Sequence, residues 1–376
     1  MFHRRSVLIG LGAMVMGQLL SGCNSTNQGQ LKIRLLKNSI PPQLLGEFRR
    51  YLDQPVKLNF KAQTQLKLLF TQLYNWSRQA QEGKSPDRPD LITLGDYWLE
   101  LAIKEGLIEP LAVENLDEWE NLPSRWQRLV QRNQQGKIAD DGKVWGAPYR
   151  WGSTVIAYRR DKFESLGWSP TDWSDLWRPE LRHHFSLLDQ PREVIGLTLK
   201  KLGKSYNTEN LREVSNLETE LIALNQQVKF YSSNAYLQPL ILGSTWLAVG
   251  WSTDIIPIQE RYSNITAIIP KSGTALWSDL WVQPSTVNQN KKNNELVEEW
   301  IKFCWTSEYA QKIALLTDAA SPLITNSPSQ NLPETLSNNP LLVPQPEILE
   351  QSDFLEPLSP DTITQYEQMW NRMRNS

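Results

Sequence analysis

The chain has 376 residues, and its 39 Lys plus Arg are balanced by 41 Asp plus Glu, giving a formal net charge of −2. This balance excludes the strongly basic field of most nucleic-acid-binding proteins, so we expect no nucleic-acid partner. The length exceeds that of one ordinary hydrophobic core and predicts two domains.

The N-terminal segment is the first predicted feature. Two arginines precede an almost wholly apolar run over residues 6–20, which ends in Leu20-Ser21-Gly22-Cys23. This order is typical of an export signal with a bacterial lipoprotein cleavage box. A transmembrane helix needs a longer apolar run, of about 20 residues. We therefore expect residues 1–22 to be a cleaved signal peptide, Cys23 to carry lipid and residues 23–30 to form a flexible spacer. The paired arginines leave the twin-arginine and the ordinary export routes both open.

Strands and helices are expected to alternate after the spacer. The predicted strands cover residues 31–36, 56–60 and 90–94, and the predicted helices begin near residues 41, 64 and 97. Such alternation favours an α/β fold with a parallel sheet, whose ligands gather where strands end. Residues 36–39 and 94–97 are therefore expected at the edges of a binding site, with Asp96 as a candidate ligand-binding residue.

A long extended segment over residues 143–160 is predicted to cross between domains, because glycine and proline interrupt it without ending its strand character. A second α/β series should follow. Its strands are expected at residues 185–188, 228–231, 246–250, 265–269 and 275–282, and its helices at 191–202, 211–225 and 236–242. Further helices are predicted at 294–305, 307–316 and 362–372.

Residues suited to catalysis are scarce. The adjacent His183 and His184 diverge on any regular element, so a metal site is not expected. The chain lacks a Walker loop, a dinucleotide glycine fingerprint and a Gly-x-Ser-x-Gly motif, so we expect neither an enzyme nor a cofactor. Cys304 stands among apolar residues and is predicted to be a small core residue.

Five short stretches occur in an order that resembles one known family. They are Gly142–Tyr149, Asp189–Gly196, Leu202–Thr208, Gly250–Ser252 and Trp277–Asp279. Together they resemble the spermidine/putrescine-binding proteins, which are solute receptors of ATP-driven (ABC) importers. The resemblance spans nearly all of the chain beyond the signal.

The resemblance implies a two-lobed periplasmic-binding-protein fold of type II, with strands that cross at a hinge and a cleft between the lobes. Lobe 1 would comprise residues 31–152 plus 277–318, and lobe 2 residues 153–276 plus 319–376. The protein would be a periplasmic, lipid-anchored monomer that traps a polyamine and delivers it to the membrane subunits of a permease.

By the same resemblance, acids and aromatic rings would surround the ligand. The implied ligand-binding residues are Asp189, Glu193, Ser233, Trp251, Trp277 and, as the central ammonium acceptor, Asp279. The first two acids could instead cap the helix that begins near Pro191, and the tryptophans could instead pack in the core. Asp279 is harder to explain as structural, because an acid within an apolar strand needs a partner.

The chain departs from the family at the ends of two strands of lobe 1. Leu36–Ser39 and Leu94–Asp96 replace polar and aromatic residues, and two cations, Lys37 and Arg150, are added. A cation near an ammonium site repels it by on the order of 1 kcal/mol or more. One expectation is that the two cations point away or pair with Asp96, which leaves a polyamine site. The other is a ligand that carries both amine and acid groups.

Two further classes of function stay open at this point. An exported hydrolase could use paired carboxylates such as Asp189 and Asp279, if one of them had a raised pKa. A lipoprotein scaffold or sensor could keep the fold without transport.

Overall fold

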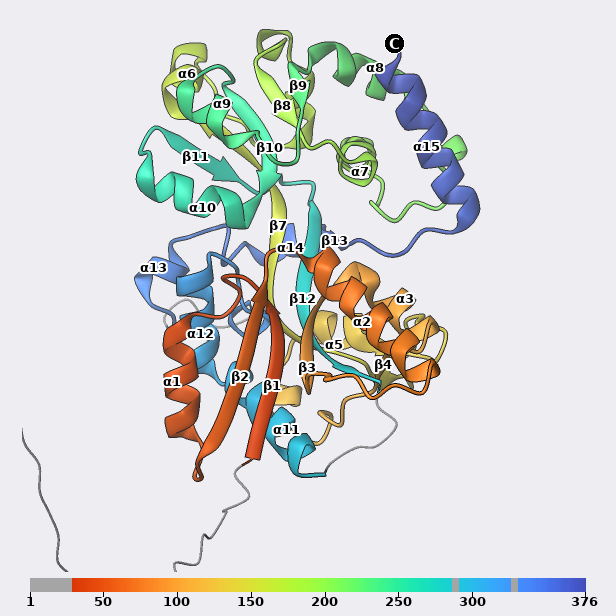
Figure 1. The fold of residues 1–376 in the computed structure, drawn as a ribbon. Coiled ribbons are helices and arrows are strands. Elements are labelled where there is room, and N and C mark those ends of the chain that lie inside the picture. The colour runs from red at the N-terminus through yellow and green to blue at the C-terminus, as the bar shows by residue number, and fades with distance from the viewer. Residues whose placement is uncertain (1–28, 286–290, 326–330) are drawn as a thin grey trace, which may run out of the picture.

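The computed structural model describes residues 29–285, 291–325 and 331–376 (Figure 1). The predicted signal peptide and the lipid site at Cys23 lie outside the described residues. The predicted spacer lies there too, except for its last two residues, which already belong to β1 (Gly29–Leu36). No described helix combines the length and the apolar character that a membrane crossing requires.

Lobe 1 is built on three parallel strands. β1 lies between β2 (Val56–Gln63) and β3 (Leu91–Gly95), with Ile33 opposite both Phe60 and Leu91. The helices of this part are α1 (Pro42–Tyr51), α2 (Leu66–Gln81), α3 (Leu99–Lys104), α4 (Asp117–Glu120) and α5 (Ser124–Val130). Three short strands complete it, β4 (Ile108–Glu109), β5 (Gln131–Arg132) and β6 (Lys143–Val144).

Two long antiparallel strands join the lobes, as Figure 1 shows. They are β7 (Ala147–Arg159) and β12 (Ala275–Pro284). β12 pairs with β3 on the side of lobe 1, whereas the second half of β7 pairs with β10 (Leu247–Trp251) of lobe 2. The main sheet therefore runs through both lobes in the order β2-β1-β3-β12-β7-β10-β8-β9.

Lobe 2 also combines strands of the main sheet with helices. β8 (Phe185–Leu187) is parallel to β10 and to β9 (Phe230–Tyr231), and β11 (Ile265–Ile268) pairs with β7. Its helices are α6 (Arg160–Leu166), α7 (Pro191–Lys201), α8 (Leu217–Gln227), α9 (Leu237–Leu242), α10 (Ser252–Arg261) and α15 (Pro360–Arg374). α15 contacts α7 and α8, so the C-terminal helix covers this lobe.

The segment between the last helices corrects the predicted division. After α11 (Lys291–Trp305) and α12 (Ser307–Thr317) the chain forms α13 (Glu334–Ser337) and α14 (Pro346–Glu350). α13 contacts α12, and Leu336 is fully buried there. Residues 319–350 were predicted in lobe 2, but the apolar side chains of residues 319–325 and 331–350 pack in the core of lobe 1 instead. The chain passes to lobe 2 only at β13 (Asp353–Phe354).

Aromatic side chains and one thiol fill the core behind the crossing strands. Tyr149 stacks on Trp281 with ring centroids 4.1 Å apart, and Trp281 meets Trp300 edge-on at 5.8 Å. Cys304 is buried in the same cluster, and burial raises the pKa of its thiol well above the ordinary value. The predicted core role of Cys304 is confirmed.

Candidate ligand-binding site

A cleft of about 590 Å³ lies where the two lobes meet. β3 and the first residues after it form one side, and the start of α7 and the β10–α10 junction form the other. The crossing strands β7 and β12 also contribute residues to the lining. Of the predicted ligand-binding residues, five line this cleft: Asp96, Glu193, Trp251, Trp277 and Asp279.

Asp189 and Ser233 are not among the lining residues. The Ser233 hydroxyl accepts a hydrogen bond from the backbone N–H of Asp189 at 3.1 Å. The exposed Asp189 carboxylate lies 3.5 Å from Arg374 of α15. The ion-pair partner of Asp189 is thus on the C-terminal helix, and the sequence around residue 189 does not predict this contact.

Asp279 and Arg150 form a buried ion pair at the crossing strands. The two residues are directly opposite each other on β12 and β7, next to a shift in the strand register. Arg150 Nε donates to Asp279 Oδ2 at 2.6 Å, and the side chains are only 8% and 1% exposed. Burial by itself would lower the pKa of Arg150, but the negative charge of Asp279 raises it above the ordinary value. The predicted ammonium acceptor therefore has a cation partner within the protein.

The positions of Arg150 and Lys37, the two cations that the family lacks, can be compared with the expectations for them. Arg150 was predicted to point away from the cleft or to pair with Asp96, and both expectations are wrong. Its guanidinium carbon lies 5.8 Å from the centre of the Trp277 ring. Lys37 is exposed and is not among the residues that line the cleft.

Asp96 is the first of two buried acids that face the cleft without a cation partner within 4 Å in the described part of the chain. It follows β3, and its Oδ1 accepts a hydrogen bond from the backbone N–H of Ser278 at 3.0 Å. Loss of water around the carboxylate raises the pKa of Asp96 to about 7. The nearby negative charge of Asp279 adds to this shift.

Glu193 is the second such acid and comes from lobe 2. It stands in the first turn of α7 and is 5% exposed. Its Oε2 atom has no partner at good hydrogen-bond geometry among the described residues, and burial raises the pKa of Glu193 to about 7 although the side chains of Thr154 and Trp251 nearby act in the opposite direction. A buried polar atom of this kind is costly unless something binds it.

Aromatic rings line the space around these acids. Trp277 of β12 and Trp251 at the end of β10 are both partly exposed to the cleft, as is Tyr97 after β3. Gly152 is required behind Trp277, because a Cβ atom at residue 152 would lie 2.3 Å from the indole ring. The alternative in which both tryptophans only pack in the core is therefore not what the structure shows, since both line the cleft.

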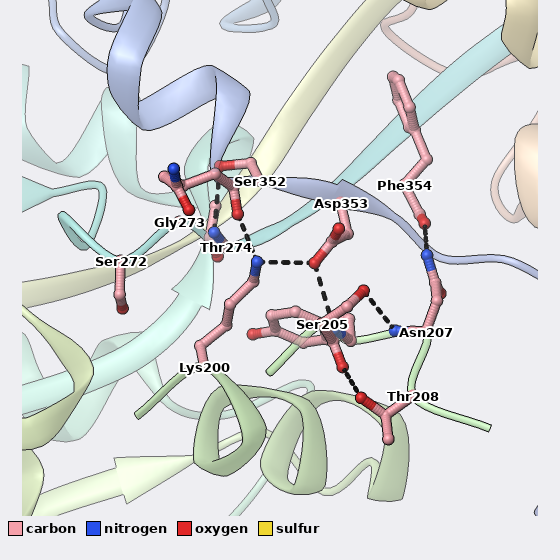
Figure 2. Close-up of polar contacts among 12 residues, drawn as sticks. Lys200, Ser205, Asn207, Thr208, Ser272, Gly273, Thr274, Ser352, Asp353 and Phe354 are labelled. Atoms are coloured by element: carbon pink, nitrogen blue, oxygen red, sulfur yellow. Dashed lines mark hydrogen bonds and ion pairs between the residues drawn. The ribbon is translucent and has the colours of Figure 1, made fainter. Parts of the chain in front are cut away.

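A strap of residues 353–358, missed by the sequence analysis, closes one side of the cleft. Its residues Leu355, Glu356, Pro357 and Leu358 all contribute to the lining. Figure 2 shows how its start is fastened to lobe 2. Lys200 of α7 forms an ion pair with Asp353 at 2.8 Å and also donates to the carbonyl of Gln351. The composition of residues 353–358 does not predict a cleft wall, because a loop that covers any hydrophobic core has similar apolar residues.

Further hydrogen bonds hold the rest of the strap in place. Asn207 Nδ2 donates to the carbonyl of Phe354 at 2.8 Å, and Asn207 Oδ1 accepts from the N–H of Glu356 at 3.0 Å. Arg192, beside Glu193 on α7, donates to the carbonyl of Glu356 at 3.0 Å. On the other side, Arg125 of lobe 1 donates at 3.1 Å to the carbonyl of Ser352, the residue whose peptide bond leads into the strap. The strap is therefore held by both lobes.

Substitution of Lys200 by methionine tests this positioning. The change leaves the Gln351 carbonyl and the Asp353 carboxylate short of a donor, so we expect a loss of about 1–3 kcal/mol in the free energy of unfolding. Hydrogen exchange of residues 351–358 should become faster, and ligand affinity should fall. Lys201→Met is the matched control, because Lys201 pairs with Glu220 of α8. Equal exchange rates of the strap in both variants would contradict the assigned role.

The match with a known family now decides the class of protein. The model of the bacterial extracellular solute-binding protein family matches residues 87–352. The chain belongs to this family. Proteins of this family bind solutes and are not enzymes, and the Asp189–Asp279 pair of the hydrolase interpretation is not brought together in the cleft. The ranges described here hold no group of three His, Cys, Asp or Glu side chains that could bind a metal.

Named relatives cover between three quarters and nearly all of the chain. The spermidine/putrescine-binding periplasmic protein of Salmonella typhimurium is 23% identical, over 98% of this chain and 97% of that protein. The putrescine-binding periplasmic protein PotF of Escherichia coli is 26% identical, over 75% of this chain and 79% of that protein. The solved structure of the PotD substrate-binding protein of Streptococcus pneumoniae has a TM-score of 0.78 at 21% identity, covering 93% of this chain and 99% of that one. The predicted two-lobed α/β fold is confirmed.

Proposed function

We propose that this solute-binding protein captures a small organic cation of the polyamine type and delivers it to the membrane permease of an ATP-driven importer. The observation that carries the proposal is the pair of buried acids, Asp96 from lobe 1 and Glu193 from lobe 2, that face one cleft without an ion-pair partner in the described residues. An ammonium group offsets the cost of burying a carboxylate.

The spacing of the two acids favours a ligand with two positive groups. Asp96 is bonded at Ser278, whereas Glu193 lies beside Thr154, whose neighbour Ser153 pairs with Leu276. The points of β12 that the two acids approach are therefore two to three residues apart, or roughly 7–10 Å at the ordinary rise per residue of a strand. A short chain of methylene groups between two nitrogens can cover such a span.

The aromatic lining suits the rest of such a ligand. Methylene groups can lie on the faces of Trp251 and Trp277, and a cation over an indole gains about 0.5–2 kcal/mol. The names of the relatives, which bind spermidine and putrescine, support the same class of ligand. Because the acids come from opposite lobes, a bound cation would favour the closed arrangement.

Isothermal titration of the purified protein with spermidine and putrescine tests the proposal. We expect saturable binding that weakens at least tenfold in Asp96→Asn and in Glu193→Gln. Glu164→Gln, an exposed acid of α6, is the control and should bind as the unaltered protein does. Absence of binding by any amine, or unchanged affinity in both cleft variants, would refute the proposed site.

We also propose that Cys23 carries the lipid that holds the protein at the membrane, on the basis of the cleavage box that precedes it. Mass spectrometry of the N-terminal peptide from the producing bacterium should show a diacylglyceryl adduct on Cys23. An unmodified thiol there would contradict the anchor.

A further inference from the structure

Arg150 occupies the position that the ligand's ammonium group was expected to take. It contacts a carboxylate, Asp279, at 2.6 Å, and it lies over an indole ring, that of Trp277, at 5.8 Å. These are the two kinds of partner that a bound ammonium would use. The positive charge at this end of the cleft is therefore supplied by the protein.

The guanidinium group still has donors to offer. Its Nε donates a hydrogen bond to Asp279, the Tyr149 hydroxyl also interacts with the guanidinium, and the side chain lines the cleft. A guanidinium is a planar fork of five N–H donors whose geometry matches a carboxylate. With one donor on Asp279 and at most one on Tyr149, at least three of these five N–H groups are available for an acceptor on a ligand.

The other arginine of the cleft is different. Both Nη groups of Arg192 are already engaged, with the carbonyls of Tyr206 and Glu356 and with the side chains of Asn207 and Tyr366. Arg192 is thus committed to holding the strap. Within the cleft lining described here, Arg150 is the arginine with donors to spare.

We infer that the ligand carries a carboxylate as well as an amine, with the carboxylate bound by Arg150 and the amine by Asp96 or Glu193. The inference rests on the proposed function, the capture of an amine in this cleft, and replaces one of the two positive groups of the polyamine-type ligand by a carboxylate. The cleft is then divided by charge: one cation held by Asp279 at the crossing strands, and two acids without ion-pair partners in the described residues, one from each lobe.

The position of the amine sets the length of the ligand. Asp96 is bonded at Ser278, next to Asp279, so an amine at Asp96 would be close to the carboxylate. Glu193 lies near residues 275–276 of β12, three to four residues from Asp279, or roughly 10–13 Å along the strand. An amine at Glu193 would therefore require a longer chain between the two charged groups.

Matched pairs of compounds test the inference by isothermal titration. Putrescine and 4-aminobutanoate share one chain length, as do cadaverine and 5-aminopentanoate, and each pair differs only in the replacement of one amine end by a carboxylate. We expect at least one amino carboxylate to bind ten times more tightly than its matched diamine. Arg150→Gln should reverse this order, because it removes the anion partner and frees Asp279 for a second ammonium.

A second variant keeps the test valid if Arg150→Gln is unstable. Arg150→Gln combined with Asp279→Asn removes both charges of the pair, so it leaves no buried charge without a partner. It should lose the preference for the amino carboxylate without gaining affinity for the diamine.

Tighter binding of the diamines by the unaltered protein would overturn the inference and leave the proposed function intact. The same preference for the amino carboxylate in the unaltered protein, in Arg150→Gln and in the double variant would do so too. Failure of every amine to bind would refute both.

Discussion

Replacement of Asp279 by asparagine is expected to lower the free energy of unfolding by about 3–5 kcal/mol, which is the usual cost of removing one partner from a buried ion pair. The substitution keeps the shape of the side chain but removes the only ion-pair partner found for Arg150 in the described residues. The guanidinium then stays buried between the two crossing strands without a counter-charge. Denaturant unfolding at neutral pH measures the loss.

The double variant Arg150→Met with Asp279→Leu is the decisive control. Apolar residues of similar size leave no charge to bury, so the double variant should recover most of the stability that Asp279→Asn loses. A double variant as unstable as the single one would show that packing, and not charge, holds the crossing strands together.

Affinity for a diamine that contacts both acids is expected to fall by about 100-fold between pH 8 and pH 6, because two acids with pKa values of about 7 must then both be ionised, whereas a ligand with one amine should lose only about tenfold. Each acid contributes about tenfold over this interval if the bound amine keeps it ionised. The amine itself stays protonated throughout, since an alkyl ammonium has a pKa near that of lysine, about 10.4. Isothermal titration at several pH values measures the slope.

The ligand-free protein should show the opposite trend in stability. A carboxyl group whose pKa is raised by folding stabilises the folded state at pH values below its unfolded pKa, and this contribution is lost as the pH rises through about 7. We expect the free energy of unfolding to decrease by up to about 2 kcal/mol per group between pH 5 and pH 8. The double variant Asp96→Asn with Glu193→Gln should lose the pH dependence of both ligand affinity and stability. If its pH dependence is the same as that of the unaltered protein, other groups cause the effect.

The two trends have one physical cause. Burial of Asp96 and Glu193 destabilises the empty cleft at neutral pH, and a bound amine removes that cost. The relief of this cost on binding therefore contributes to the affinity for the amine. The Arg150–Asp279 pair is different, because its two charges are satisfied within the chain at 2.6 Å.

Local patterns were enough to predict most strands and helices of both lobes. The apolar run over residues 91–94 and the long extended segment around residue 150 correspond to β3 and β7. Between residues 211 and 225 a single helix was predicted, but α8 begins only at Leu217, after Asn216 adopts a left-handed backbone conformation with φ of 65°. One residue of this kind interrupts a helix without disturbing the apolar pattern around it.

The site was predictable only in part. Residues 94–97 were placed at its edge because they follow a buried parallel strand, and Asp96 and Tyr97 do line the cleft. The pairing of Arg150 with Asp279 could not be predicted, because the residues are 129 positions apart and meet through the register of two antiparallel strands. Asp189 was assigned to the cleft by resemblance, yet its partner is Arg374 on the last helix.

The sequence by itself determined the class of fold, the acids and indoles available to a ligand, and the absence of a catalytic motif, because these follow from residue type and from periods of two to four residues. Only the tertiary structure decided which charges neutralise each other. Ion pairing depends on distances of a few ångströms between residues far apart in the chain, and those distances are set by strand register and by the packing of lobes. Hence Asp279 is paired by Arg150, whereas Asp96 and Glu193 are left for a ligand.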